Sequence, residues 1–219
     1  MEELPLLART LLVVVTMLFS VTAHEWAHAF VAVRLGDKTP QQDGRLSFDP
    51  LVHMDMMGTV LWPALMSFLG SGYLGWGRPV DVRPVRFRRG IPERGGAILV
   101  ALAGPLMNLL LCLLVVLLLQ VLIMAGVPLD SGYGRAALIM GQSMLLTNAM
   151  LVVVNLVLPV FPMFDAFRIL QVLLGDDHPV IRGILQYQLF MLLLVFLVFG
   201  FVIGGLHALL YSSILGLLL

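Results

Sequence analysis

The chain has 219 residues, of which 60% are hydrophobic and only 12% charged, with a formal net charge of zero. This apolar share far exceeds that of a soluble domain, and several runs approach the roughly 20 residues that cross a bilayer. The balanced charge gives no sign of a nucleic-acid partner. Because only closed hydrogen-bonded structures are stable in lipid, we predict an all-α polytopic membrane protein, with about four to five transmembrane helices forming a single domain, 1–219.

The first predicted span, residues 5–35, contains the motif H-E-W-A-H at residues 24–28. Residues four apart lie on one face of a helix, so His24 and His28 can bind one cation while Glu25 lies beside it. Two imidazoles and a carboxylate suit Zn²⁺ and leave a fourth position for water. Glu25 is then the predicted catalytic base that takes a proton from this water.

The alternative for this motif is a pair of core histidines beside an unrelated glutamate. The apolar run from Leu11 to Ala23 belongs in lipid, where ionisable groups are expensive and usually functional. Three such groups within five residues therefore favour a metal site. His28 lies about two turns before Gly36, which places the metal roughly 10 Å inside the membrane boundary.

The next region, residues 37–94, is predicted to hold a hairpin, a re-entrant segment and a basic loop. A small β-hairpin around Arg45–Phe48 could receive an extended substrate by strand addition, although an ordinary surface loop is as compatible with these residues. His53 and Asp55 fit either a pair behind the metal ligands or a solvated loop. The apolar stretch 56–69 is too short for a full crossing, so we expect it to be re-entrant or interfacial.

A basic stretch follows, which favours a cytoplasmic loop over a specific ligand site; it contains Arg83, Arg86, Arg88, Arg89 and Arg94. Residues 95–125 and 136–162 are the next predicted core spans. Asn108 in the first of them could bond a neighbouring helix or support the substrate.

The segment 163–178 is expected to supply the third metal ligand, Asp165, because H-E-x-x-H requires one more protein ligand. The rival role for Asp165 is the N-cap of a helix over residues 166–174. Asp176 and His178 are weaker candidates for the ligand.

The number of membrane crossings between His28 and Asp165 also favours a shared metal site. If residues 56–69 are re-entrant, the next two spans return Asp165 to the side of His24 and His28, near the cytoplasmic face. Residues 180–219 are predicted to form the C-terminal helices, with one crossing and a second or interfacial helix.

From about residue 24 to 170, five segments resemble motifs of the site-2 protease family of intramembrane zinc metalloproteases, in its compact prokaryotic branch. They are residues 24–28; Leu51, His53, Asp55, Gly58 and Thr59; G-W-G-R-P-V at 75–80; A-G-P-L-M-N at 103–108; and Asn155, Pro159, Pro162 and Asp165. The chain departs from the family pattern in two places. Ala166 follows the ligand aspartate where glycine is usual, and the interval between Asn155 and Asp165 is two residues longer than the usual spacing in the family.

The resemblance implies hydrolysis of peptide bonds within or next to transmembrane segments of protein substrates, with one Zn²⁺ per chain. It also implies a multi-pass protein of a prokaryotic inner membrane, with the bilayer and transmembrane proteins as partners. Asn108, Asn155 and His53 are the expected support for the substrate or the oxyanion. The alternatives are a zinc carrier, or a catalytically silent metal-binding protein that sequesters membrane helices.

Overall fold

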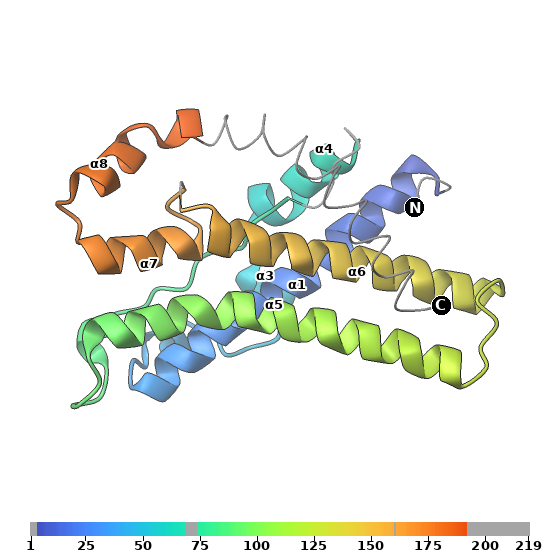
Figure 1. Ribbon diagram of the computed structural model, residues 1–219, viewed down its shortest axis with the longest axis horizontal. Helices are drawn as coiled ribbons and strands as arrows, with labels where there is room; N and C mark the ends of the chain where they lie inside the picture. Colours follow the sequence, from blue (N-terminus) through green and yellow to red (C-terminus); the bar gives the residue numbers. More distant parts are fainter. Residues whose placement is uncertain (1–3, 69–73, 160, 192–219) are drawn as a thin grey trace.

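Three long helices form the body of the protein in a computed structural model that describes residues 4–68, 74–159 and 161–191 (Figure 1). They are α1 (Leu6–Leu35), α5 (Glu93–Met124) and α6 (Gly132–Val157), and each is long and apolar enough to cross a membrane. The all-α prediction is confirmed for the described residues. The three helices match the predicted spans 5–35, 95–125 and 136–162 to within a few residues, whereas further crossings stay a prediction.

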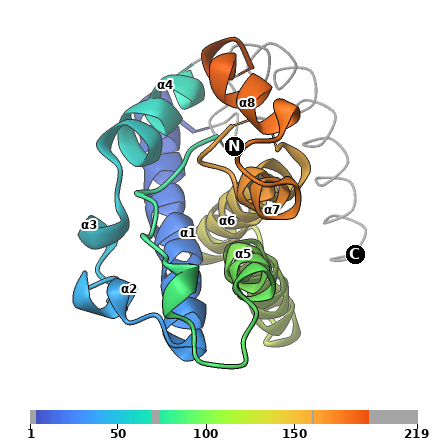
Figure 2. The same cartoon turned by 90° about the vertical axis from the view of Figure 1, so that its left-hand side faces the viewer.

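The three helices pack side by side (Figure 2), and α5 runs antiparallel to both α1 and α6 (Figure 1). Between α1 and α6, Val13 packs with Leu146, Met150 and Val154. Lipid is as apolar as these side chains, so helix association in a membrane depends on close packing and interhelical hydrogen bonds. A cluster of hydroxyl groups supplies such bonds deep in the interface: Thr16 Oγ1 lies 3.2 Å from both Ser143 Oγ and Thr147 Oγ1.

The outer face of α5 is a continuous apolar surface suited to lipid. Its exposed side chains are Leu99, Leu106, Leu109, Leu110, Leu113, Leu114, Leu117, Leu118 and Val121.

The region between α1 and α5, residues 36–92, leaves the C-terminal end of α1 and later returns to that end. Midway it reaches the N-terminal end of α1, where Arg9 Nη2 donates to Ser67 O over 2.6 Å. At the return, Arg83 N donates to Asp37 Oδ2 over 2.6 Å. Its short helices are α2 (Thr39–Gln42), α3 (Pro50–His53), the π-helix η1 (Met56–Leu61), α4 (Trp62–Phe68) and the 3₁₀ helix η2 (Pro84–Arg86).

The β-hairpin predicted around Arg45–Phe48 does not form, and the described residues contain no strand. The chain turns here because the buried guanidinium of Arg45 donates to Val52 O and Pro79 O, each over 2.9 Å. One side chain thus holds two separate carbonyls and the backbone wraps around it instead of pairing with itself. The short apolar helix predicted at 56–69 is present over Met56–Phe68, while its re-entrant course stays a prediction.

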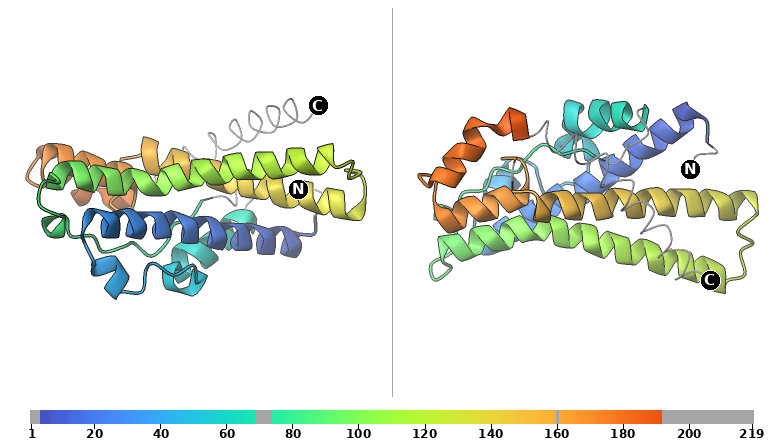
Figure 3. Two further views of the ribbon diagram at one scale, coloured as in Figure 1. Left: turned by 90° about the horizontal axis from the view of Figure 1, so that it is seen from below. Right: turned by 45° about the horizontal axis from the view of Figure 1, so that its top comes forward.

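Two further helices close the described part of the chain: α7 (Asp165–Leu174) and α8 (Pro179–Gln186). Helix α7 follows the C-terminal end of α6 and lies beside the first turns of α5 (Figure 3). Phe167 of α7 packs against Ile181 and Ile184 of α8. Of the predicted C-terminal helices, residues 192–219 lie outside the described residues.

Candidate metal centre

The two histidines of α1 meet Asp165, which lies at the start of α7. His24 Nε2 lies 3.2 Å from Asp165 Oδ2, and His28 Nε2 lies 3.2 Å from Asp165 Oδ1. The two Nε2 atoms are 3.0 Å apart, and all three residues are buried. Two residues from the first span and one some 140 positions later therefore converge on one point.

Asp165 is not the N-cap of α7. Helix α7 begins at Asp165 itself, with Phe164 in the cap position and no side-chain cap bond. The carboxylate reaches the two histidines, even though Ala166 stands where the family has glycine.

Helix α5 packs against both imidazoles through Val100, Gly104 and Asn108, which are spaced four residues apart and so lie on one face of the helix. Val100 O lies 2.7 Å from His28 Nδ1, and Asn108 Oδ1 lies 2.5 Å from His24 Nδ1. Gly104 stands between them, where a Cβ atom would collide with Nε2 of both histidines. A residue without a side chain is thus required for α5 to approach the site this closely.

The donor atoms fit a cation. A backbone carbonyl only accepts, so His28 Nδ1 carries the hydrogen facing Val100 O and His28 Nε2 keeps its lone pair. In the same way, His24 Nδ1 carries the hydrogen that faces the carboxamide oxygen of Asn108, and His24 Nε2 keeps its lone pair. Two lone pairs then face a buried carboxylate whose Oδ2 has no hydrogen-bond partner among the described residues. Such electron-rich atoms repel one another unless a cation lies between them, and two histidines with one aspartate are a ligand set of catalytic zinc.

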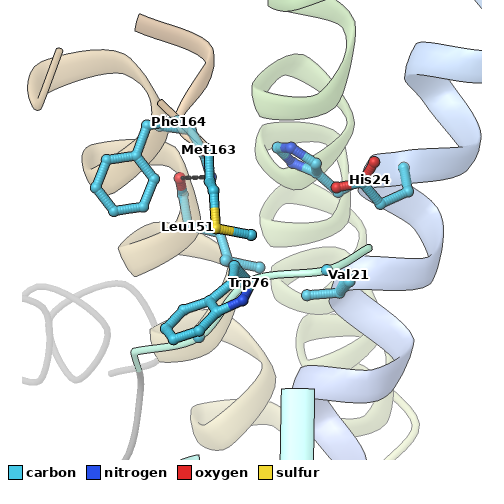
Figure 4. Close-up of a pocket in the computed structure, with 10 residues that line it drawn as sticks. Val21, His24, Trp76, Leu151, Met163 and Phe164 are labelled. Atoms are coloured by element: carbon cyan, nitrogen blue, oxygen red, sulfur yellow. Dashed lines mark hydrogen bonds between the residues drawn. The ribbon is translucent and has the colours of Figure 1, made fainter. Parts of the chain in front are cut away.

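A small pocket opens beside His24 (Figure 4), and Glu25 is one of its lining residues. Glu25 is buried, and its Oε2 has no hydrogen-bond partner within the described part of the chain. The lining residues are Val21, His24, Glu25, Gly75, Trp76, Gly77, Leu151, Asn155, Met163 and Phe164. The pocket therefore brings together one metal ligand, His24, and the free carboxylate oxygen of Glu25.

The segment 74–80 forms one wall of this pocket and is anchored on its other side. Trp76 N donates to Gly58 O over 3.1 Å, Thr59 Oγ1 donates to Trp76 O over 2.8 Å, and Arg78 N donates to His53 O over 2.9 Å. On the pocket side, a Cβ atom at Gly77 would meet Val21 and Glu25. The segment therefore packs closely against the face of α1 that carries Val21 and Glu25.

Asp55 positions Gly58 and Thr59, the two residues that bond to Trp76. Its Oδ1 accepts from Gly58 N over 2.7 Å and so caps η1, while its N–H donates to Thr59 Oγ1 over 3.1 Å. Gly58 in turn provides the room for the indole of Trp76.

The three predicted support residues occupy different places. Asn155 lines the pocket, and its Nδ2 donates to Leu151 O over 2.9 Å. Asn108 lies behind His24 and also bonds to α6, which was the neighbouring-helix alternative. His53 is fully buried outside the pocket lining. Burial lowers the pKa of His53, and its neutral ring donates from Nε2 to Ser47 O over 2.8 Å.

The weaker ligand candidates do not join the cluster. Asp176 accepts from Gln171 Nε2, and His178 caps α8 by accepting from Val180 N. The role of the Val100 carbonyl was not predicted, because no residue type signals a backbone acceptor. The role of Asn148 of α6 was not predicted either, although its signal was a carboxamide within an apolar span.

Two comparisons with known proteins found similarities. A family model described as peptidase family M50 matches residues 12–138. A protein of Bacillus subtilis (strain 168) with the name "Putative zinc metalloprotease YwhC" is 34% identical over 158 residues, which cover 72% of this chain and 67% of that protein. No solved structure matches the chain. Both similarities support a metalloprotease function, and the chain belongs to peptidase family M50, the family of the site-2 proteases.

Proposed function

We propose that this protein is an intramembrane zinc metalloprotease that hydrolyses peptide bonds within or next to transmembrane segments of other proteins. The observation that carries the proposal is the convergence of His24, His28 and Asp165 on one buried point, with the free carboxylate oxygen of Glu25 in the adjoining pocket. His24, Glu25 and His28 lie in a helix long and apolar enough to cross a membrane, so the substrate would be met at the depth of the bilayer.

His24, His28 and Asp165 would hold the ion, and bound zinc would supply Lewis-acid activation of water and of the scissile carbonyl. Glu25 is placed to accept the proton of the attacking water and to return it to the leaving amine. The buried surroundings strengthen these electrostatic interactions, because little water is present to screen them. Asn155 is the polar side chain of the pocket available to a substrate carbonyl.

The backbone of residues 75–77 offers a docking edge for an unwound substrate. Trp76 uses its N–H and C=O toward Gly58 and Thr59, whereas the N–H and C=O groups of Gly75 and Gly77 have no partner among the described residues. A transmembrane helix satisfies its own amides, so it must unwind before hydrolysis. The exposed amides of the unwound stretch could then pair with Gly75 and Gly77 by strand addition.

The path of residues 37–83 supports a re-entrant course and a site near the cytoplasmic face. The region starts at Asp37 and returns to it through the bond from Arg83, so both of its ends lie at the same end of α1. The arginines at 83–94 follow directly, and basic loops remain on the cytoplasmic side. On this basis α7 would lie at the cytoplasmic end, and the resemblance to the compact prokaryotic branch of the family supports a prokaryotic inner membrane.

The test uses purified full-length protein in detergent, with a model transmembrane substrate and added zinc. Glu25→Gln should keep the zinc content near one per chain and reduce cleavage by at least 10²-fold, as expected for loss of a general base. Asp165→Ala should lose both zinc and cleavage, because an inner ligand is missing.

The outcomes separate this proposal from its rivals. Unchanged cleavage by Glu25→Gln would contradict the protease mechanism. Zinc binding without any cleavage by the unaltered protein would favour a silent binder or a carrier. Full zinc content in Asp165→Ala would show that another group completes the site.

A further inference from the structure

Behind His24, a chain of buried carboxamides extends through α5 to α6. Asn108 Nδ2 donates to Asn148 Oδ1 over 2.8 Å. Asn148 Nδ2 donates to Ser20 Oγ over 2.9 Å and to Met144 O over 2.8 Å. Asn108 and Asn148 are both fully buried at the level of the metal ligands. Their amides therefore have no water to exchange with, and each group must be satisfied by its protein neighbours.

The Met144 carbonyl sets the direction of every bond in this chain. It only accepts, so the Asn148 amide must turn its NH₂ toward it and its Oδ1 toward Asn108. Asn108 must then donate with its NH₂, which leaves its own Oδ1 facing His24. That oxygen can only accept, so His24 carries its hydrogen on Nδ1. The lone pair of His24 is thereby confined to Nε2, the atom that faces Asp165.

We propose that Asn148 is a positioning residue for the metal centre: through Asn108 it holds His24 in the tautomer that presents Nε2 to zinc. Without the Asn148 acceptor, the Asn108 amide can rotate and present its NH₂ to His24. The favoured tautomer would then carry its lone pair on Nδ1, away from Asp165. Within the described part of the chain, the other acceptor for Asn108 Nδ2 is Ser20 O at 3.4 Å, and this long contact is too weak to hold the amide alone.

His28 needs no such relay, since Val100 O acts on it directly. The two ligands of α1 are thus oriented in different ways, one by a backbone carbonyl of α5 and one by a carbonyl of α6 acting through two side chains. Groups that orient metal-bound histidines typically change metal affinity by about 10–100-fold when removed.

The experiment measures zinc affinity of the purified full-length protein by competition with a chelator, together with the visible absorption spectrum of the Co²⁺-loaded form. Asn148→Leu keeps the branched shape of the side chain and removes the acceptor, so zinc affinity should fall by about 10–100-fold and the Co²⁺ band should change shape. Asn148→Ala gives the same readout if the leucine variant does not fold.

Two further variants separate positioning from packing. A neutral acid in Asn148→Asp keeps one donor for Met144 O and one acceptor for Asn108, so it should restore most of the affinity. Thr147→Val is the matched control: Thr147 is a fully buried neighbour on α6 that also bonds to α1, but through Thr16 and not toward His24. It should lower thermal stability and leave zinc affinity unchanged.

Wild-type zinc affinity in Asn148→Leu or Asn148→Ala would overturn the inference. So would an equal loss in Thr147→Val, or a loss in Asn148→Asp as large as that in the leucine variant. The inference rests on the proposed metal site but fails separately from it. If the unaltered protein binds no zinc, the proposed function fails; if it binds zinc and the Asn148 variants bind it equally well, only the relay fails.

Discussion

Gly104 shows at the residue scale how the absence of a side chain makes the metal site possible. It lies on the face of α5 that carries the carbonyl for His28 and the carboxamide for His24, and a Cβ there would occupy the space of both Nε2 atoms. The sequence analysis found this glycine within a motif, but no spacing rule connects it with histidines some 80 residues earlier. Its role is to admit α5, and only the packing of α5 on α1 reveals it.

We expect Gly104→Ala to lower zinc affinity by at least 10-fold, because the new methyl group must displace the imidazoles that bind the ion. Alanine favours a helix by about 1 kcal/mol over glycine, so the helix itself should not suffer. The measurement is zinc competition with a chelator, beside thermal unfolding of the apoprotein.

Gly95→Ala on the same helix is the control, since a Cβ there meets nothing within 4 Å. Equal zinc affinity in the Gly104 and Gly95 variants would show that α5 is not in close contact with the ligands.

At the scale of elements, Asp37 ties the returning segment to the end of α1. Its Oδ1 accepts from Thr39 N over 3.0 Å and from Thr39 Oγ1 over 2.6 Å, and its Oδ2 accepts from Arg83 N. Arg88 N adds a bond to Leu35 O over 2.8 Å. Burial raises the pKa of Asp37, but the bonds from Thr39 and from the Arg83 N–H outweigh it, and the net effect is a lowered pKa.

A lowered pKa means that the unfolded state takes up a proton more readily than the folded state as the pH falls. The stability from Asp37 should therefore be complete above its ordinary pKa of 3.8 and decline below it, as the pH approaches the folded pKa. Asp37→Asn should lower the free energy of unfolding by about 1–3 kcal/mol at neutral pH.

Unfolding of both proteins in detergent, followed from pH 7 downward, checks this prediction. The difference between them should shrink below the ordinary pKa of the carboxyl group. A difference that is independent of pH would mean that the charge of Asp37 plays no part.

At the scale of the whole molecule, the fold places the start of α5 and α7 at one end of the bundle, and the α5–α6 turn at the other (Figure 1). The short turn between two antiparallel helices forces this separation. If α5 and α6 cross the membrane, positions 88 and 133 must lie on opposite sides of it.

We predict that a cysteine at Arg88 reacts with an impermeant reagent only from the cytoplasmic side, and a cysteine at Tyr133 only from the other side. Both native side chains are exposed, so neither substitution disturbs packing. A Cys112→Ala background removes the natural thiol, which burial already makes less reactive. Labelling of Arg88→Cys from outside would overturn the proposed orientation and the re-entrant course of residues 37–83.

The sequence by itself determined what depends on local spacing. Apolar runs long enough to cross a bilayer predicted about four to five spanning helices, of which the described residues contain three. The four-residue separation of His24 and His28 placed both on one face with Glu25 beside them. The choice of Asp165 also came from the sequence, because ionisable groups in apolar surroundings are rare enough to narrow the candidates. A local pattern acts within one element, so it can be recognised without the rest of the fold.

Only the tertiary structure decided which groups meet between elements. In place of the predicted hairpin it has a turn around Arg45, whose guanidinium donates to the carbonyls of Val52 and Pro79. It also connected His24 with Asn108 and Asn148, and brought Gly77 against Glu25. Such contacts depend on where α5, α6 and residues 74–80 pack on α1, and the direction of a buried hydrogen bond depends on neighbours that no interval along the chain specifies.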